Sequence, residues 1–317
     1  MKKLISVVAP MYNEEGLVGL YVDETLSVLN QAAAGGYDFE ILLVNDGSKD
    51  ATLQKMQEAQ DMHPEHVGIV NLTRNFGLEG AVNAGLRKAS GDAVIVMDAD
   101  LQDPPGLILE MVRKWESGAD IVVGSRTDRS RDSFMKRTTA GLYYRVLDLL
   151  SGKLKLERSS ANYRLLSRRA VDVLLALPEV NTYFRVDVPF IGMKVEKVEY
   201  SRNERAAGKT KYSFSSLVRC ALDGLTSISI EPLRKVGLSV PFCFIACAAA
   251  VFLAVFGDGM WRLAGVMVAV CSFFSSIILL AISIVAEYVG QIMTEARHRP
   301  TSIIYDYRPA KIVEERS

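Results

Sequence analysis

Five short apolar runs rich in β-branched residues recur along the first 125 residues, and amphipathic stretches separate them. Runs of this kind predict strands, and the stretches between them have the spacing of helices. Near-continuous hydrophobic strands that alternate with helices are typical of a mostly parallel sheet covered on both faces. The predicted strands are residues 4–9, 39–44, 67–72, 93–98 and 120–125, and the predicted helices are about 14–33, 50–62, 77–90 and 105–117.

A polar segment follows each of the five predicted strands, with the sequences PMYNEE, VNDGSKD, NLTRNFG, MDADLQD and GSR. The carboxyl ends of parallel strands meet at one edge of a sheet, and ligands bind in the crevice beyond that edge. Neither G-x-G-x-x-G nor G-x-x-x-x-G-K-[ST] occurs in the chain, which disfavours a Rossmann dehydrogenase and a P-loop NTPase. We therefore expect a binding crevice that holds its ligand without either of these glycine-rich motifs.

Two apolar segments near the C-terminus, residues 236–257 and 263–286, contain no charged side chain. Each is long enough to cross a hydrocarbon core about 30 Å thick as a helix, and the short DGMWR connection makes them a hairpin. Basic residues flank the hairpin on its outer ends, so residues 1–215 and the tail 291–317 are expected in the cytoplasm. Residues 216–233 mix apolar and charged positions and predict either a juxtamembrane amphipathic helix or an ordinary connecting helix. The alternative for the hairpin is a buried core element.

The overall charge is balanced, with 37 Lys and Arg against 37 Asp and Glu. Basic residues gather between positions 126 and 169, which indicates either a site for phosphates or a solvated helical face. The four cysteines have no metal-binding spacing, and three lie in apolar stretches, which fits a cytoplasmic domain.

Asp98 and Asp100 alternate at the end of the fourth predicted strand, so both side chains are expected on one side with Ala99 opposite. Two neighbouring carboxylates repel each other unless a cation lies between or beyond them. Hard oxygen ligands favour Mg²⁺ or Mn²⁺, which bind through one or two carboxylates and the phosphates of a substrate. Gln102 adds a carbonyl oxygen on the same alternation, whereas Asp103 before two prolines is typical of a helix cap.

Taken together, these motifs and the segments NYRLLSRR, ERAAGKTKY and EYVGQIMTEARHRP resemble the family 2 glycosyltransferases that load a sugar onto a polyprenyl phosphate, such as bactoprenol glucosyltransferases and dolichol-phosphate mannose synthases. The resemblance covers nearly the whole chain. It implies a GT-A fold, Rossmann-like with a mostly parallel sheet, followed by the membrane hairpin. It also implies a nucleotide-diphosphate sugar donor, most readily UDP-glucose, an undecaprenyl phosphate acceptor, Mg²⁺ or Mn²⁺, and inversion at the anomeric carbon. The protein would lie in the bacterial inner membrane, without a nucleic-acid partner, as a homo-oligomer for which relatives suggest a tetramer.

The resemblance also assigns roles to residues. Asp98, Asp100 and Gln102 would hold the metal and the donor, and Arg205 would act on the phosphates during transfer. The donor site would include Pro10, Tyr12, Glu14, Asn45, Asp46, Asn75, Asp98 and Gln102, and the phosphate or acceptor site would include Arg126, Arg137, Arg164, Arg205, Thr210 and Lys211.

Asn162 stands where relatives often have an aspartate that is a candidate general base. A phosphate monoester is mostly a dianion at neutral pH because its second pKa is about 6, so it needs little help from a base. We therefore expect Asn162 to orient a substrate without abstracting a proton.

Two other functions remain open from the sequence. A processive membrane glycan synthase shares the strand ends, but the Q-x-x-R-W acceptor motif is absent around Trp115 and Trp261. A non-catalytic anchored subunit that binds a nucleotide sugar is the second, and the Asn162 substitution is its main support.

Overall fold

The computed structural model describes residues 2–126, 160–178, 184–201 and 259–316. Contacts divide the chain into two units. The described part of the first is residues 2–126, 160–178, 184–201 and 299–316, which we call the sheet domain. The described part of the second is residues 259–298. The predicted juxtamembrane helix and the first predicted span, residues 236–257, lie outside the described residues.

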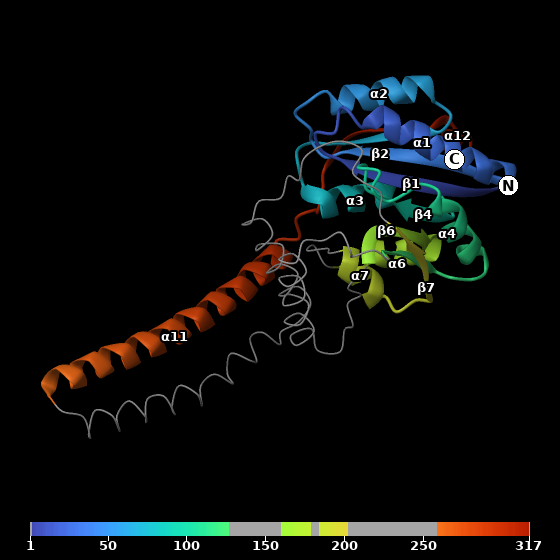
Figure 1. The fold of residues 1–317 in the computed structure, drawn as a ribbon. Helices are drawn as coiled ribbons and strands as arrows, with labels where there is room; N and C mark the ends of the chain where they lie inside the picture. The colour runs from blue at the N-terminus through green and yellow to red at the C-terminus, as the bar shows by residue number, and fades with distance from the viewer. Residues whose placement is uncertain (1, 127–159, 179–183, 202–258, 317) are drawn as a thin grey trace. The chain divides into compact units, whose positions relative to one another are not determined.

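The sheet domain contains an eight-stranded sheet with the strand order β7-β5-β6-β4-β1-β2-β3-β8 (Figure 1). The five strands expected from the sequence are present and are close to their predicted bounds. Three further strands, β6, β7 and β8, were not predicted. The strands are β1 (Lys3–Met11), β2 (Tyr37–Asn45), β3 (Val67–Leu72), β4 (Ala93–Val96), β5 (Ile121–Arg126), β6 (Ser160–Ser167), β7 (Val195–Tyr200) and β8 (Ile304–Arg308).

The pairing is parallel at the centre and mixed towards both sides. Strands β4, β1, β2 and β3 form a continuous parallel block. Strand β6 is antiparallel to both β4 and β5, so β5 and its parallel neighbour β7 run in the same direction as the central block. The predicted mostly parallel sheet is therefore confirmed, but β6 separates β4 from β5.

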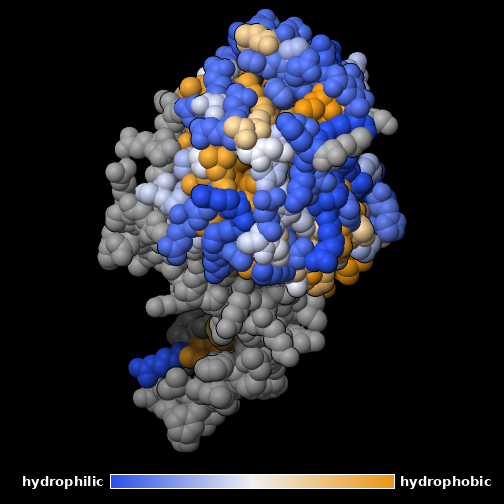
Figure 2. All heavy atoms as spheres, turned by 90° about the vertical axis from the view of Figure 1, so that its right-hand side faces the viewer, coloured by the Kyte–Doolittle hydropathy of each residue, from blue (hydrophilic) through white to orange (hydrophobic). Residues whose placement is uncertain are grey.

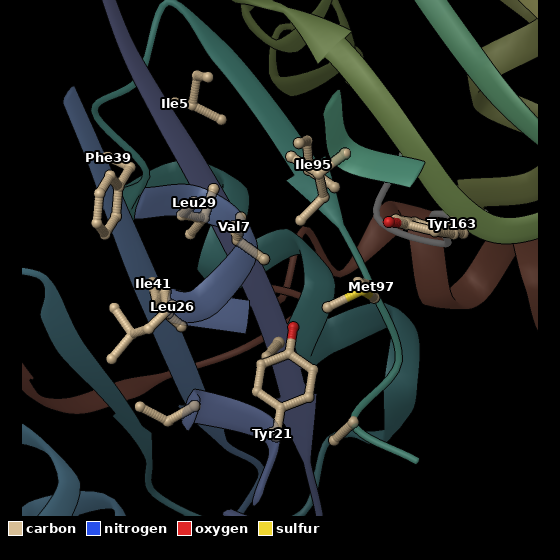
Figure 3. Close-up of a cluster of buried hydrophobic side chains, with 14 of the residues drawn as sticks. Ile5, Val7, Tyr21, Leu26, Leu29, Phe39, Ile41, Ile95, Met97 and Tyr163 are labelled. Atoms are coloured by element: carbon tan, nitrogen blue, oxygen red, sulfur yellow. The ribbon is translucent and has the colours of Figure 1, made fainter. Parts of the chain in front are cut away.

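Helices cover both faces of the sheet, as the strand pattern predicted. On one face, α1 (Val18–Ala34), α2 (Thr52–Met62) and α4 (Leu107–Glu116) enclose a core with alternate residues of β1 and β2. Figure 3 shows Leu26 and Leu29 of α1 packed beside Val7 and Ile41 in this core. On the other face lie α3 (Gly77–Lys88), α6 (Arg168–Leu175) and α7 (Phe184–Phe190). The sheet domain is mainly hydrophilic on the face shown in Figure 2.

The predicted cytoplasmic tail is more structured than the sequence indicated, because β8 pairs antiparallel with β3 at the edge of the sheet. A short helix, α12 (Lys311–Glu314), follows, and Ala310 is fully buried. The side chain of Gln60 donates to the carbonyl of Arg308 at 3.3 Å, and Arg316 forms an ion pair with Asp38. The end of the chain is therefore part of the sheet domain.

The second unit contains α11 (Met260–Ala296), a helix of 37 residues that includes the second predicted span. Residues Phe273–Ala296 are long and apolar enough to cross a membrane, with a mean hydropathy of 2.0, and no part of that window is buried. Length and composition are thus consistent with one of the two predicted spans.

Candidate active site

The carboxyl ends of six strands lie at the same edge of the sheet. Strands β1 to β4 are parallel, and the two antiparallel pairings through β6 bring β5 and β7 into the same direction. Strand β6 begins at this edge, since Ser160 is paired with Ser125 near the end of β5. The polar segments that follow the strands therefore meet where the sequence predicted a crevice.

The metal-binding candidates lie on a turn directly after β4, which ends at Val96 and not at Asp98 as predicted. The side chains of Asp98, Asp100 and Gln102 are partly exposed, whereas Ala99 and Leu101 are buried. The expected alternation is therefore confirmed, although a turn produces it. Leu101 has a φ of 54°, and the backbone N–H of Gln102 donates to the Asp100 carboxylate at 3.2 Å.

The oxygen atoms on this turn suit a hard divalent cation. Within the described part of the chain, no three His, Cys, Asp or Glu side chains are grouped as a complete metal site. Mg²⁺ and Mn²⁺ do not need such a group, because they retain waters and take ligands from substrate phosphates. Two partly exposed carboxylates and a partly exposed Gln102 amide on the same turn fit this mode of binding.

Asn162 lies next to the same turn. Arg164 of β6 is paired with Val96, the last residue of β4, and the two strands are antiparallel. Asn162 is two residues closer to the carboxyl edge than Arg164, which places it beside the start of the Asp98–Gln102 turn. It is 4% exposed. Strand pairing thus brings together two sequence motifs that are about 60 residues apart.

Asp103 has a different role from the predicted helix cap. Helix α4 begins at Leu107, and its N-cap residue Gly106 provides no side-chain bond. Asp103 is buried and accepts hydrogen bonds from the Tyr200 hydroxyl and from Nη2 of Arg126 at 3.2 Å. The Arg126 guanidinium was predicted to contact phosphate. It lies at the carboxyl end of β5, where it is bonded to Asp103.

Asp46 at the end of β2 binds the segment that precedes α3. Its two carboxylate oxygens accept from the backbone N–H groups of Phe76 at 2.7 Å and Gly77 at 3.0 Å. These N–H groups lie at the positive end of α3, so the carboxylate caps this helix from another segment. Burial raises the pKa of Asp46 to about 6, although the two N–H groups act in the opposite direction. Asn75, also predicted to bind donor, is exposed beside this contact.

The segments after β1 and β2 hold each other. The backbone N–H of Asn13 donates to Ser48 Oγ at 3.0 Å, and that of Glu14 donates to Thr52 Oγ1 at 2.8 Å. Asn45 is buried and accepts from the backbone N–H of Ser48 at 3.1 Å, so it shapes the turn and is not open to a ligand. Of the other donor candidates, Pro10 is buried within β1, whereas Tyr12 and Glu14 are partly exposed at the edge.

Arg164 was predicted to contact the phosphate or the acceptor, but its side chain is buried inside the sheet domain. It is 1% exposed, its Nη1 donates to the carbonyl of Phe184 at 3.0 Å, and its guanidinium lies over the Phe184 ring. The residue therefore joins β6 to the start of α7. Alternation explains this error, since Asn162 and Arg164 share a face of β6 but only Asn162 is near the edge.

The other predicted phosphate-binding residues, Arg137, Arg205, Thr210 and Lys211, lie outside the described residues. The contacts of Asp103 and the burial of Asn45 were missed by sequence reasoning. The sequence carried no signal for the contacts of Asp103, because Tyr200 ends a strand that was not predicted.

Comparison with known proteins identifies the family. The model of Glycosyl transferase family 2 matches residues 6–175, which is more than half of the chain. A bactoprenol glucosyl transferase of Shigella phage SfV is 37% identical over 305 residues, covering 95% of this chain and 97% of the relative. The uncharacterized glycosyltransferase YkcC of Bacillus subtilis is 35% identical over 303 residues, covering 94% and 92%.

Among solved structures, the mannosyltransferase PcManGT of Pyrobaculum calidifontis, in complex with GDP-Man and Mn²⁺, is similar over 93% of this chain and 86% of its own. The TM-score is 0.47 and the identity 18%. From the family match, the near-full-length relatives and the sheet with its edge of strand ends, we conclude that the chain belongs to glycosyl transferase family 2 and is a glycosyltransferase with a GT-A-like fold.

Proposed function

We propose that this enzyme transfers a hexose from a nucleotide-diphosphate sugar, UDP-glucose being the first candidate, to the phosphate of undecaprenyl phosphate. The reaction would take place at the cytoplasmic face of the bacterial inner membrane. The observation that carries this proposal is the partly exposed pair Asp98 and Asp100 beside Asn162, at an edge where six strands end. The near-full-length similarity to a bactoprenol glucosyl transferase supports the lipid acceptor.

The donor would lie along the edge of the sheet. The nucleoside end would contact the segments after β1 and β2, where Tyr12 and Glu14 are partly exposed. Asp46 contributes by holding the Phe76–Gly77 backbone in place. The diphosphate would reach the turn that carries Asp98, Asp100 and Gln102. When bound there, Mg²⁺ or Mn²⁺ would withdraw charge from the departing diphosphate.

The acceptor needs orientation more than it needs a base. A phosphate oxygen of the lipid attacks the anomeric carbon while the bond to the nucleoside diphosphate breaks, which inverts the configuration at that carbon. Because the attacking phosphate is already ionised, Asn162 can act by orienting a substrate through its amide. Correct placement of two reactants lowers the barrier by about 7–11 kcal/mol in favourable cases, so orientation is a sufficient role.

The reaction can be tested directly with the full chain in membranes. Radiolabelled UDP-glucose, GDP-mannose and UDP-amino sugars are offered with undecaprenyl phosphate, and the label is followed into a butanol-extractable lipid. We expect one labelled monosaccharide lipid whose formation stops with EDTA and returns with Mn²⁺ or Mg²⁺. Labelled polymer would indicate a processive synthase, and a lack of transfer from every donor would contradict the proposal.

Two substitutions separate the roles at the site. Asp100→Ala should reduce transfer by about 1000-fold or more, because it removes a ligand of the catalytic metal. Asn162→Ala should reduce it by about 10–100-fold, because orientation is weakened without loss of the metal. Asp61→Asn, at an exposed position on α2, is the matched control and should retain full activity. Equal and small losses in the first two variants would refute these assignments.

A further inference from the structure

Three segments of the sheet domain converge on one buried carboxylate. Asp103 follows directly after the Asp98–Gln102 turn, Arg126 is the last residue of β5, and Tyr200 is the last residue of β7. Asp103 is 1% exposed, and it is the acceptor for both of the other side chains. We call these three residues the Asp103 junction.

The junction is closed by bonds between each pair of its members. The Tyr200 hydroxyl donates to Asp103 Oδ1, and Nη2 of Arg126 lies 3.2 Å and 3.3 Å from the two oxygens of Asp103. Nε of Arg126 donates to the Tyr200 hydroxyl at 3.1 Å. The charge of the buried carboxylate is thus balanced by one guanidinium, and the phenol orients both. Burial and the Asp103 charge also raise the pKa of Tyr200, so the hydroxyl remains a donor.

The junction adjoins the metal-binding turn without being part of it. The turn contains a non-glycine residue in the left-handed region, Leu101, and the backbone N–H of Gln102 donates to the Asp100 carboxylate within it. Asp103 is the first residue after the turn whose side chain is fixed by other strands. Because Gln102 directly precedes Asp103 and its N–H donates to Asp100, the position at which Asp103 is held constrains Gln102 and, through that bond, Asp100.

We propose that Asp103, Arg126 and Tyr200 form a positioning unit that sets the metal-binding turn and the Arg126 guanidinium at a fixed separation for a metal-bound diphosphate. This inference rests on the proposed function, because the ligand is the diphosphate of the donor. The new element is that the Tyr200 hydroxyl, at the end of β7, sets the distance between the metal-binding turn and the Arg126 guanidinium.

A purely structural role would lower stability alone, so the test needs a readout of the site itself. Tyr200→Phe removes the hydroxyl and keeps the ring. Tyr163→Phe is the matched control, since Tyr163 is also buried, lies edge-on to Tyr200 and donates to the carbonyl of Pro104 at 3.2 Å, but does not bond Asp103. Both variants lose one buried phenol hydroxyl near the same turn.

Binding of Mn²⁺ is measured by electron paramagnetic resonance on the purified full chain, with UDP and in parallel with GDP. Loss of a residue that orients metal ligands typically weakens metal binding by about 10–100-fold, so Tyr200→Phe should weaken Mn²⁺ binding by at least about tenfold. Tyr163→Phe should change it by less than about twofold, although both variants should lower the thermal midpoint by similar amounts. Asp103→Asn, if it folds, should lower affinity at least as much as Tyr200→Phe.

The outcomes separate this inference from the proposed function. If wild-type protein binds Mn²⁺ with a nucleoside diphosphate and Tyr200→Phe binds it equally well, the positioning role is wrong while the metal site stands. Equal weakening in Tyr200→Phe and Tyr163→Phe would also overturn it, because general loosening would then explain both. If wild-type protein binds no Mn²⁺ with either nucleotide, the metal-dependent function itself fails.

Discussion

Replacement of Gly47 by alanine should disrupt the segments that we propose to contact the nucleoside. Gly47 lies between β2 and α2 with a φ of 62°, a conformation that residues with a Cβ rarely adopt. A Cβ at this position would lie 2.3 Å from the carbonyl carbon of Arg74 and 2.5 Å from the backbone nitrogen of Asn75. Favourable carbon contacts are about 3.5–4.0 Å, so the backbone at residues 74–75 must move by about 1 Å or more.

The cost can be estimated from two terms. The left-handed conformation costs a non-glycine residue about 1–2 kcal/mol. Forcing extra volume into a packed contact adds about 1–3 kcal/mol, which gives about 2–5 kcal/mol in total. For a domain of this size, that corresponds to a fall of about 4–20 °C in the thermal midpoint. Since Asp46 binds the displaced segment through Phe76 and Gly77, nucleotide affinity should fall as well.

The assay compares Gly47→Ala with Gly16→Ala on the full chain in detergent. Gly16 lies on the segment after β1 and has no atom within 4 Å of an added Cβ, so its substitution should be tolerated. Thermal unfolding gives the stability, and calorimetric titration with UDP gives the affinity. The reasoning is refuted if Gly47→Ala matches Gly16→Ala in both measurements.

Two further predictions concern pH and topology. Because the pKa of Asp46 is raised to about 6, its contribution to stability is present below about pH 4 and is lost as pH rises towards about 6. The free energy of unfolding of Asp46→Asn should therefore rise by about 1–3 kcal/mol relative to that of wild type between pH 4 and pH 7, measured by denaturant titration. If the difference between the two proteins stays the same across this range, the raised pKa of Asp46 is wrong. In a chain without its native cysteines, Tyr305→Cys and Met62→Cys, both at exposed positions, should react with an impermeant maleimide from the same face of sealed vesicles. Reaction from opposite faces would contradict the pairing of β8 with β3.

The central sheet was predictable because its signal is local. Strands buried on both faces give runs such as Phe39–Val44 that no other element explains as well, and polar residues mark where they end. The alternation of Asp98, Asp100 and Gln102 was also predictable, since it depends only on neighbouring residues. The metal-binding role of these residues stays a prediction, and the structure differs from the sequence in placing them on a turn, because β4 ends at Val96.

The remaining strands were missed because their partners are distant in sequence. Strand β6 contains Arg164 at a buried position, where a charged residue is rare, and its burial depends on Phe184 and on α7. Strand β8 has the sequence IYDYR, lies at the edge of the sheet, and is paired with residues more than 230 positions earlier. Asp103 was predicted to cap a helix because the signal for a cap lies in the residues that follow directly in the sequence. Its hydrogen-bond partners, Arg126 and Tyr200, belong instead to β5 and β7.

The pairing of β8 with β3 also constrains how the chain can be anchored. Strands β1 and β8 belong to one sheet, so they must lie on the same side of any membrane. Helix α11 stands between them in the sequence, and its apolar window is followed by only seven residues before β8 begins. If α11 crosses the membrane, the number of crossings between Tyr200 and Ile304 must be even. The two spans predicted from the apolar residues 236–257 and 263–286 would satisfy this condition, which holds independently of charge because a strand cannot pair across a bilayer.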